Sequence, residues 1–353
     1  MIRLALIFGG QSSEHSVSCV TALGVFTAID KTKYEVVPIG ITKSGQLTLQ
    51  PINETWRLAD NPEVVLSDQV YPALGGGNWT TASGLDLGVI DVAFPVLHGP
   101  NGEDGSIQGL LQLCHVPYAG NGVLASAVAM EKSKAKAVFR DAGLRVADSL
   151  VCLETQYRMS PQEFLKECEE HFSLPIFVKP SRSGSSVGVS KVKDFADLGA
   201  AIEVAFQHDN TVLVEECVVG REVECAVLES SDGSLRVSLA GEILVTGREF
   251  YDYEAKYLDG GAELLVPTHL TTEELAQMHS LAIKAFRALG CSGLARTDFF
   301  LTAEGFVLTE VNTMPGFTPI SMYPSLFQAT GVSYTELVDT LIQTGLSQGT
   351  QPR

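Results

Sequence analysis

The chain has 353 residues, of which 45% are hydrophobic, so it is long enough for two or three domains with sizeable cores. Its net charge of −18 and pI of about 4.8 argue against nonspecific binding to nucleic acid or to an acidic membrane, since both require a basic face. The seven cysteines are scattered and include no CxxC pair, which suits a reducing cytosol and predicts no thiolate metal site.

The N-terminus is too short in its apolar part for a signal peptide, and no apolar run reaches the length of a membrane span. We therefore expect a cytoplasmic protein that binds neither membranes nor nucleic acid.

The first third of the chain predicts an α/β domain on a parallel sheet. A buried strand at residues 4–8 ends at two glycines and precedes an amphipathic helix at 16–29, the order that begins a βαβ unit. The dinucleotide fingerprint GxGxxG is absent. Strands are expected at 35–41 and 89–95, whereas the polar residues 44–85 indicate a variable surface region.

Two polar sites follow from this layout. Glu14 precedes the first helix, where an acid also has the simpler role of complementing the helix dipole. His98 and Glu103 lie in a glycine-rich loop after the strand at 89–95, where open α/β sheets bind ligands. They could serve a substrate or hold a tight loop.

The middle of the chain concentrates positive charge. A helix at residues 127–142 carries Lys132, Lys134 and Lys136, and a strand holding Lys179 runs into a serine- and glycine-rich loop at 181–188. Small residues let backbone N–H groups approach phosphate oxygens, although the Walker A pattern does not match. The alternative is a flexible hairpin tip, but a lysine within an apolar strand is costly unless it is paired.

A further strand at 211–214 is followed by a short linker and a second strand that carries Glu222. Backbone groups in such a linker can bind adenine edge-on, which leaves a carboxylate for the ribose hydroxyls. Charged strand ends are also ordinary surface features.

Residues 296–312 predict a hairpin with a three-residue loop centred on Glu304. In this register Thr302 faces Phe306, Phe300 faces Leu308, and Asp298 faces Glu310. Arg296 then faces Asn312, so these two residues share one face with the opposed carboxylates. Opposed carboxylates repel each other unless a cation such as Mg²⁺ binds between them, and the alternative is a solvated hairpin face.

Together these segments resemble the ATP-grasp enzymes and, within them, the D-alanine–D-alanine ligase family. The resemblance extends from about residue 2 to 341. It rests on the segments Gly9-Gly-Gln-Ser-Ser-Glu-His-Ser-Val-Ser18, His98-Gly-Pro-Asn-Gly-Glu-Asp-Gly105, Val178-Lys-Pro-Ser-Arg-Ser-Gly-Ser-Ser-Val-Gly188, Phe250-Tyr-Asp-Tyr-Glu-Ala-Lys-Tyr257 and Glu310-Val-Asn-Thr-Met-Pro-Gly316.

The resemblance implies an ATP-grasp fold with an N-terminal doubly wound, parallel-sheet α/β domain. We expect this domain at residues 1–125, with the first D-alanine subsite. A central ATP-grasp domain is expected at 126–219, and a C-terminal ATP-grasp domain with the lid and the metal site at 220–353.

The resemblance also implies the ATP site. Lys132 and Lys179 are expected on the phosphates, Glu215 on the adenine amino group with backbone at Glu216 and Val218, and Glu222 on the ribose. Two Mg²⁺ ions, for which Mn²⁺ can substitute, are expected on Asp298, Glu310 and Asn312. Lys256 is expected to hold the transferred phosphate.

The implied reaction joins two D-alanines through a D-alanyl phosphate intermediate, for peptidoglycan precursor synthesis. Arg296 and the backbone N–H of Gly316 are expected to stabilise the oxyanion. Glu14 is expected to bind the first ammonium group through Ser185 and Tyr257, near His98. Ser321 and Met322 are expected to meet the second carboxylate at a helix start.

Residues 246–261 resemble the lid of the family, which excludes water from the acyl phosphate. Relatives that use D-lactate carry histidine in this lid, so Tyr257 favours the amine acceptor, and D-serine is not excluded. We expect a homodimer, as is common in the family. The alternatives are another ATP-grasp ligase and a nucleotide-binding regulator on a decayed fold.

Overall fold

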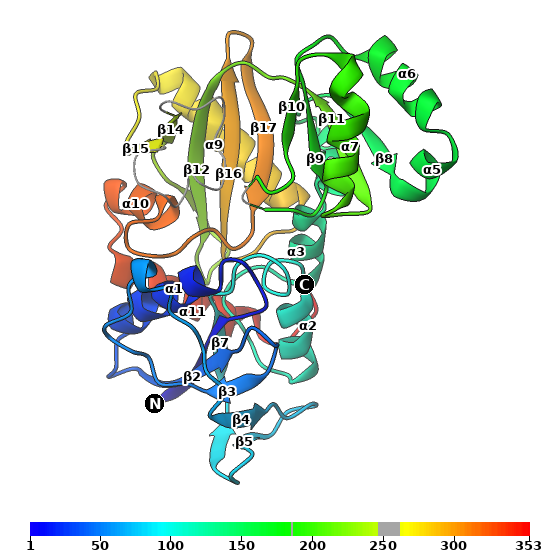
Figure 1. The fold of residues 1–353 in the computed structure, drawn as a ribbon. Coiled ribbons are helices and arrows are strands. Elements are labelled where there is room, and N and C mark those ends of the chain that lie inside the picture. The colour runs from blue at the N-terminus through cyan, green and yellow to red at the C-terminus, as the bar shows by residue number, and fades with distance from the viewer. Residues whose placement is uncertain (185, 246–261) are drawn as a thin grey trace.

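The computed structural model describes residues 1–184, 186–245 and 262–353. Three sheets organise these residues, and Figure 1 shows the N-terminal sheet at one end, the C-terminal sheet above it and the central sheet to one side. In the part of the chain that the structure describes, no helix has the length and apolar character needed to cross a lipid bilayer.

The N-terminal sheet has seven strands in the order β6-β5-β4-β3-β2-β1-β7. β1 (Ile2–Gly9) lies parallel to β2 (Tyr34–Ile41) and β7 (Val92–Pro95), as predicted for this domain. The other strands continue the sheet in antiparallel pairs. They are β3 (Leu47–Leu49), β4 (Asp68–Tyr71), β5 (Asn78–Thr81) and β6 (Asp86–Val89).

The interpretation of residues 44–85 as only a variable surface region is therefore wrong. This segment forms β3, β4, β5 and the short helix η1 (Leu58–Asp60), and Trp79 within it is fully buried. Strands of three or four residues are too short for an alternating pattern to be recognised, which explains the error.

Helices cover both faces of the N-terminal sheet because β1 is apolar on both sides. Leu4, Leu6 and Phe8 pack in one core with residues of α1 (His15–Ala28) and α11 (Tyr334–Gln348). The alternate residues Ala5 and Ile7 pack in a second core with α2 (Ser106–Leu113).

The helix predicted at 127–142 is interrupted. α3 (Val123–Met130) and α4 (Lys132–Asp141) meet at Glu131, which has extended backbone angles. The Lys132 N–H donates to the carbonyl oxygen of Ser181 at 3.1 Å instead of closing a helical turn. The break therefore joins these helices to the base of the serine-rich loop.

The central sheet has the strand order β10-β9-β11-β8 and is antiparallel. One face packs against helices, whereas the other carries Lys179 and Glu215. Its elements are β8 (Ser149–Leu153), α5 (Glu154–Met159), α6 (Pro161–His171), β9 (Ile176–Pro180), β10 (Ser190–Val192), η2 (Phe195–Asp197), α7 (Leu198–Phe206) and β11 (Thr211–Glu216).

The C-terminal sheet has the order β15-β14-β12-β16-β17, with β13 also paired to β12. α9 (Thr272–Ala288) packs on one face and α10 (Met322–Ala329) on the other. The strands are β12 (Arg221–Glu229), β13 (Leu235–Val237), β14 (Gly241–Val245), β15 (Ala262–Leu265), β16 (Leu294–Thr302) and β17 (Gly305–Asn312).

One hydrophobic core crosses between the two ends of the chain. It combines Leu4 and Phe94 of the N-terminal sheet with Leu228, Tyr323 and Leu341 of the C-terminal part. Asn121 reinforces this junction because its buried side-chain amide donates to the carbonyl oxygens of Leu294 at 2.6 Å and Thr313 at 2.7 Å. The boundaries at 125 and 220 stay predictions, but the outer two segments share a core.

Candidate active site

The β16–β17 hairpin places Asp298 opposite Glu310 and Arg296 opposite Asn312, as the sequence predicts. The predicted turn is wrong, however. The loop has two residues, Ala303 and Glu304, so that Thr302 pairs with Gly305 and Phe300 with Val307. A bulge at Thr309 takes up one residue of β17 and restores the expected register at the polar end.

A third carboxylate continues this polar row onto the neighbouring strand. Glu224 of β12 pairs with Asp298 of β16, so Glu224, Asp298 and Glu310 lie side by side on three adjacent strands. Opposed like charges destabilise a sheet, and Glu224 has a side chain that is only 3% exposed. The row therefore requires cations next to it.

Arg296 supplies one of these cations. Its guanidinium lies 2.8 Å from a Glu224 oxygen and donates two bonds of 2.7 and 2.8 Å to the carboxylate of Asp298. Burial alone would lower the pKa of Arg296, but the charges of Asp298 and Glu224 outweigh it and raise the pKa well above its ordinary value. Arg296 is therefore a permanent, oriented positive charge.

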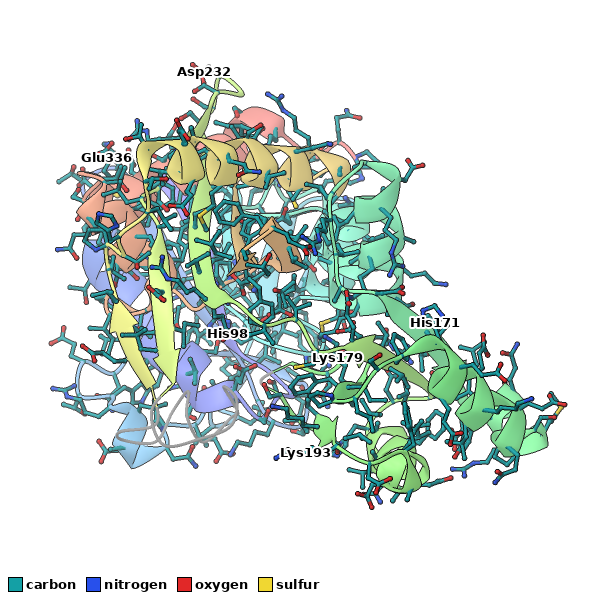
Figure 2. All side chains as sticks on the ribbon, turned by 90° about the horizontal axis from the view of Figure 1, so that it is seen from above. His98, His171, Lys179, Lys193, Asp232 and Glu336 are labelled. Atoms are coloured by element: carbon teal, nitrogen blue, oxygen red, sulfur yellow. The ribbon has the colours of Figure 1, made fainter. Side chains whose placement is uncertain are left out.

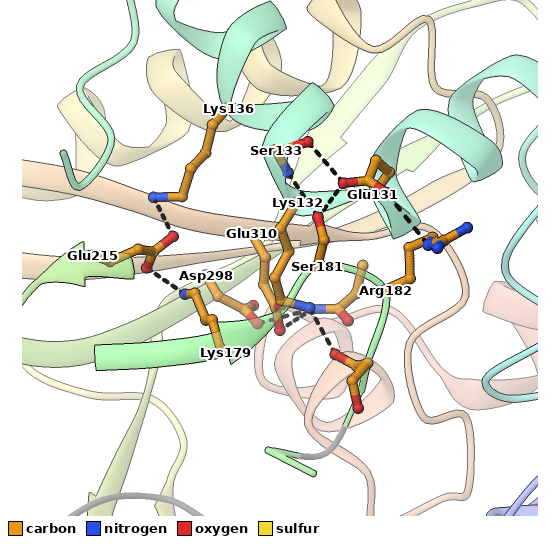
Figure 3. A network of polar contacts seen from close by, with 12 residues as sticks. Glu131, Lys132, Ser133, Lys136, Lys179, Ser181, Arg182, Glu215, Asp298 and Glu310 are labelled. Carbon is orange, nitrogen blue, oxygen red and sulfur yellow. Dashed lines mark hydrogen bonds and ion pairs between the residues drawn. The ribbon is translucent and has the colours of Figure 1, made fainter. Parts of the chain in front are cut away.

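Lys132 supplies the second cation and links two sheets. Its Nζ lies 4.0 Å from a Glu310 oxygen and donates to the carbonyl oxygen of Ser183 at 2.8 Å. Figure 3 shows Lys132 between the carboxylates of the C-terminal sheet and the serine-rich loop. This lysine therefore faces a space bounded by the central sheet and the C-terminal sheet.

Glu131 fastens the base of the same loop. Its carboxylate accepts hydrogen bonds from the hydroxyls of Ser133, at 2.7 Å, and Ser181, and it lies 3.4 Å from the Arg182 guanidinium. We refer to Glu131, Ser133, Ser181 and Arg182 as the loop clasp. It fixes where the serine-rich loop leaves β9.

A cavity of about 210 Å³ lies between the central and C-terminal sheets. Its walls include apolar side chains suited to a planar base together with every described residue predicted for the nucleotide. Those nucleotide residues are Lys132, Lys179, Glu215, Glu216, Val218 and Glu222, and the apolar walls include Phe177, Phe300, Val307 and Leu308.

Glu215 is buried between two lysines at this cavity. Lys136 Nζ lies 2.9 Å from one carboxylate oxygen, and Lys179 forms an ion pair with the other. Burial would raise the pKa of Glu215, but the two ammonium charges outweigh burial and lower it. The side chain of Glu216 points elsewhere and accepts a bond from the Asp148 N–H at 2.8 Å.

A second cavity, of about 420 Å³, adjoins the metal-binding candidates and opens toward the N-terminal sheet. It brings together segments that are far apart in the sequence. The residues predicted for substrate binding and catalysis that line it are Glu14, His98, Arg296, Gly316, Ser321 and Met322.

His98, labelled in Figure 2, is buried beside acids in this second cavity. Its Nδ1 lies 3.8 Å from Glu103, whose carboxylate also accepts the Gly99 N–H at 2.9 Å. Burial lowers the pKa of His98, but the interaction with Glu103 and the negative charge of Glu14 outweigh it, so the pKa is raised. Glu103 therefore holds the loop and also acts on His98.

The helix start predicted at Ser321 and Met322 is confirmed. α10 begins at Met322, with Ser321 as its N-terminal cap residue. The Ser321 hydroxyl is bonded to Thr318, both to its N–H at 3.1 Å and to its hydroxyl at 2.7 Å. The predictions for Ser185, Lys256, Tyr257 and the lid at 246–261 fall outside the described residues.

Asp298, Glu310 and Asn312 fit a hard divalent cation by their chemistry. They offer carboxylate and amide oxygens on one face, and Asn312 contacts Asp298 at 2.8 Å and Glu310 at 3.4 Å. Among the described residues, no three His, Cys, Asp or Glu side chains form a ready metal cage. Mg²⁺ needs no such cage, because it keeps water and substrate phosphates as ligands.

Three residues of this region had no role predicted from the sequence, namely Glu131, Lys136 and Glu224. Glu224 could have been found by strand alternation, since it lies two residues after Glu222, but only the pairing with β16 shows its partner. Lys136 lies four residues after Lys132, on the same side of α4, which is a usable signal.

Comparisons with known proteins agree with this architecture. A family described as "D-ala D-ala ligase N-terminus" matches residues 3–121, and one described as "D-ala D-ala ligase C-terminus" matches residues 138–343. The chain is 46% identical over 370 residues to a D-alanine–D-alanine ligase of Nocardia farcinica, covering 99% of this chain and 98% of the relative. It is 47% identical over 363 residues to one of Pseudarthrobacter chlorophenolicus, covering 99% and 95%.

Solved structures are similar over almost the whole chain. The VanG D-Ala:D-Ser ligase of Enterococcus faecalis has a TM-score of 0.85 and 36% identity, covering 98% of this chain and 99% of that one. The D-alanine–D-alanine ligase of Coxiella burnetii has a TM-score of 0.83 and 31% identity, covering 98% and 94%.

Proposed function

Since this chain belongs to the D-alanine–D-alanine ligase family, we propose that it joins two D-alanines into D-alanyl-D-alanine with ATP, for peptidoglycan precursor synthesis. The observation that carries the proposal is the row of three carboxylates beside Arg296 and Lys132, at the meeting point of two cavities. Such a row suits a site that binds metal and polyphosphate.

ATP is proposed to lie in the cavity between the central and C-terminal sheets. Glu215 accepts from the adenine amino group, backbone at Glu216 and Val218 binds the base, and Glu222 binds the ribose. The lysines at 132 and 179 and the serine-rich loop hold the phosphates, and Lys256 is assigned to the transferred one.

The metal is assigned to Asp298, Glu310 and Asn312, as two Mg²⁺ ions for which Mn²⁺ can substitute. Bound there, the metal supplies charge neutralisation on the phosphates. Arg296 keeps its positive charge and its orientation whether or not Asp298 is engaged by metal, because Glu224 also holds it.

The chemistry has two steps. A carboxylate oxygen of the first D-alanine attacks the γ-phosphorus, the bond to the β-phosphate oxygen breaks, and ADP leaves a D-alanyl phosphate. The amine of the second D-alanine then attacks the acyl carbon, the bond to the phosphate oxygen breaks, and the amine proton is lost as phosphate departs. Arg296 and the Gly316 N–H stabilise the oxyanion between these events.

The two substrates are assigned to opposite sides of the larger cavity. Glu14, with Ser185 and Tyr257, binds the ammonium group of the first D-alanine near His98. Ser321 and Met322 meet the carboxylate of the second at the start of α10. The lid at 246–261 is proposed to exclude water from the acyl phosphate, and the protein is proposed to be a cytoplasmic homodimer.

The test is phosphate release by the purified protein with ATP and Mg²⁺, with products identified by mass. D-Alanine should give D-alanyl-D-alanine, whereas L-alanine should give nothing. Separate arms with D-serine and D-lactate define the acceptor, and Mn²⁺ replaces Mg²⁺ in another. Light scattering after gel filtration tests the dimer.

The alternatives predict other results in the same assay. Another ATP-grasp ligase would consume ATP only with a different acid and amine. A nucleotide-binding regulator would bind ATP without releasing phosphate under any condition. Either result would overturn the proposed activity.

A further inference from the structure

Lys136 is a buried lysine to which the proposed reaction assigns no role. Its side chain is only 3% exposed, lies on α4 and lines the nucleotide cavity beside Glu215. It is anchored on two oxygens, the Glu215 carboxylate at 2.9 Å and the carbonyl oxygen of Ala147 at 3.0 Å. A buried ammonium group requires such partners, because its desolvation is otherwise costly.

Lys136 and Lys179 hold the same carboxylate from different sides, as Figure 3 shows. They differ in their surroundings. Both line the cavity, but Lys179 comes from β9 and is 15% exposed, and its ion pair with Glu215 is a contact between neighbouring strands. Lys136 is more enclosed and is tied to the backbone of the segment that precedes β8.

We propose that Lys136 is a positioning residue for the nucleotide, which holds Glu215 ionised and in place at the adenine end of the cavity while Lys179 turns to the phosphates. The inference rests on the proposed function, in which Glu215 accepts a hydrogen bond from the adenine amino group.

The physical reason is a competition for Lys179. If Glu215 had Lys179 as its counter-ion and no Lys136, phosphate binding by Lys179 would leave a buried carboxylate uncompensated. With Lys136 present, the carboxylate keeps a partner in both states, so ATP does not have to break a sole ion pair. Lys136 therefore acts on base recognition through Glu215.

The experiment compares ATP with ITP, in which an oxygen replaces the 6-amino group. In Lys136→Met the preference for ATP over ITP in kcat/KM should fall by about fivefold or more, and the KM for ATP should rise by about tenfold with kcat changed less. Lys134→Met is the matched control, because Lys134 lies on the same helix but is exposed. It should leave the preference unchanged.

A purely structural role for Lys136 predicts a different result, namely equal losses with ATP and ITP. That outcome would overturn the proposal. If Lys136→Met does not fold, the double variant Lys136→Met with Glu215→Gln removes one charge of each sign and leaves no buried carboxylate without Lys136. Because Lys136 acts through Glu215, the double variant should be no worse than Glu215→Gln alone, and additive losses would also refute the inference.

Calorimetric binding of ATP and ITP to the same proteins separates the two hypotheses. If the wild-type protein fails to join D-alanine, the proposed reaction is refuted. A selective loss of ATP affinity in Lys136→Met would still support the role of Lys136. If ligation is found and the binding preference of Lys136→Met is unchanged, only the inference about Lys136 falls.

Discussion

Glu224→Gln tests how the carboxylate row orients Arg296. The substitution keeps the shape of the side chain and removes one charge at a contact of 2.8 Å with the guanidinium. Asp298 remains in direct contact through two hydrogen bonds. In this variant Asp298 would be the carboxylate that orients Arg296, and Asp298 is also assigned to the metal.

The expected loss of free energy follows from the kind of contact that is removed. Removing one partner of a buried ion pair can cost about 3–5 kcal/mol when the other charge is left uncompensated. Here Asp298 still compensates Arg296, so a charged hydrogen bond worth about 1.5–3 kcal/mol is the better measure. Expressed in the transition state, this loss lowers the rate by a factor of about 10 to 150.

Two kinetic changes should appear together. kcat should fall more than the KM for D-alanine rises, because Arg296 is assigned to the oxyanion of the transition state. The Mg²⁺ concentration for half-maximal rate should also rise, because Arg296 and the metal now compete for Asp298. Both are measured by steady-state phosphate release with Mg²⁺ as a varied component.

The matched control is Glu242→Gln. Glu242 is also a buried carboxylate paired with an arginine of the same sheet, with 2.6 Å between its carboxylate and the more exposed Arg221, but it is not in contact with Arg296. It should lower stability without changing the Mg²⁺ requirement. If Glu224→Gln behaves like this control, with kcat within about twofold of wild type, the reasoning about Arg296 is refuted.

Three further predictions concern the surrounding contacts. Glu131→Gln should weaken the loop clasp and raise the KM for ATP by about tenfold, and an unchanged KM in phosphate-release kinetics would contradict this. His98 has a raised pKa, so its protonation stabilises the fold below its unfolded pKa of 6.5, and this stability is lost as pH rises through the folded pKa. Glu103→Gln should therefore lower the pKa of His98 in an NMR titration, and a constant pKa would exclude Glu103 as the cause. Asn121→Leu should cost about 3 kcal/mol, because it leaves two buried carbonyls without a donor. Thermal unfolding measures that loss, and an unchanged midpoint would show that the junction does not depend on Asn121.

The sequence predicts the polar end of the hairpin and misplaces its tip, for a physical reason. Alternation along β16 and β17 determines which side chains share a face, and Arg296, Asp298, Glu310 and Asn312 follow it. Turn length and bulges depend on local backbone geometry, which residue type constrains weakly. The predicted three-residue loop and the observed two-residue loop with a bulge give the same register beyond Thr309.

Other parts of the site depend on contacts between distant segments. The helix predicted at 127–142 breaks at Glu131 because Lys132 and Ser133 bond to Ser181, which is about fifty residues away in sequence. The role of Glu224 depends on its pairing with β16, and the role of Lys136 depends on its ion pair with Glu215 of β11. Local periodicity carries no information on such pairings, whereas family motifs do bring the main site residues together.

The shared core also bears on how the chain folds during synthesis. Helix α11 supplies Leu337, Leu341 and Ile342 to the core that contains Leu4 and Phe94. At ribosomal speed, the roughly 215 residues between Ala119 and the start of α11 take about 10–40 s to emerge. For that time the first sheet is complete in sequence, but one of its apolar faces is covered by α1 without α11, so the nascent chain exposes apolar surface that suits a holding chaperone.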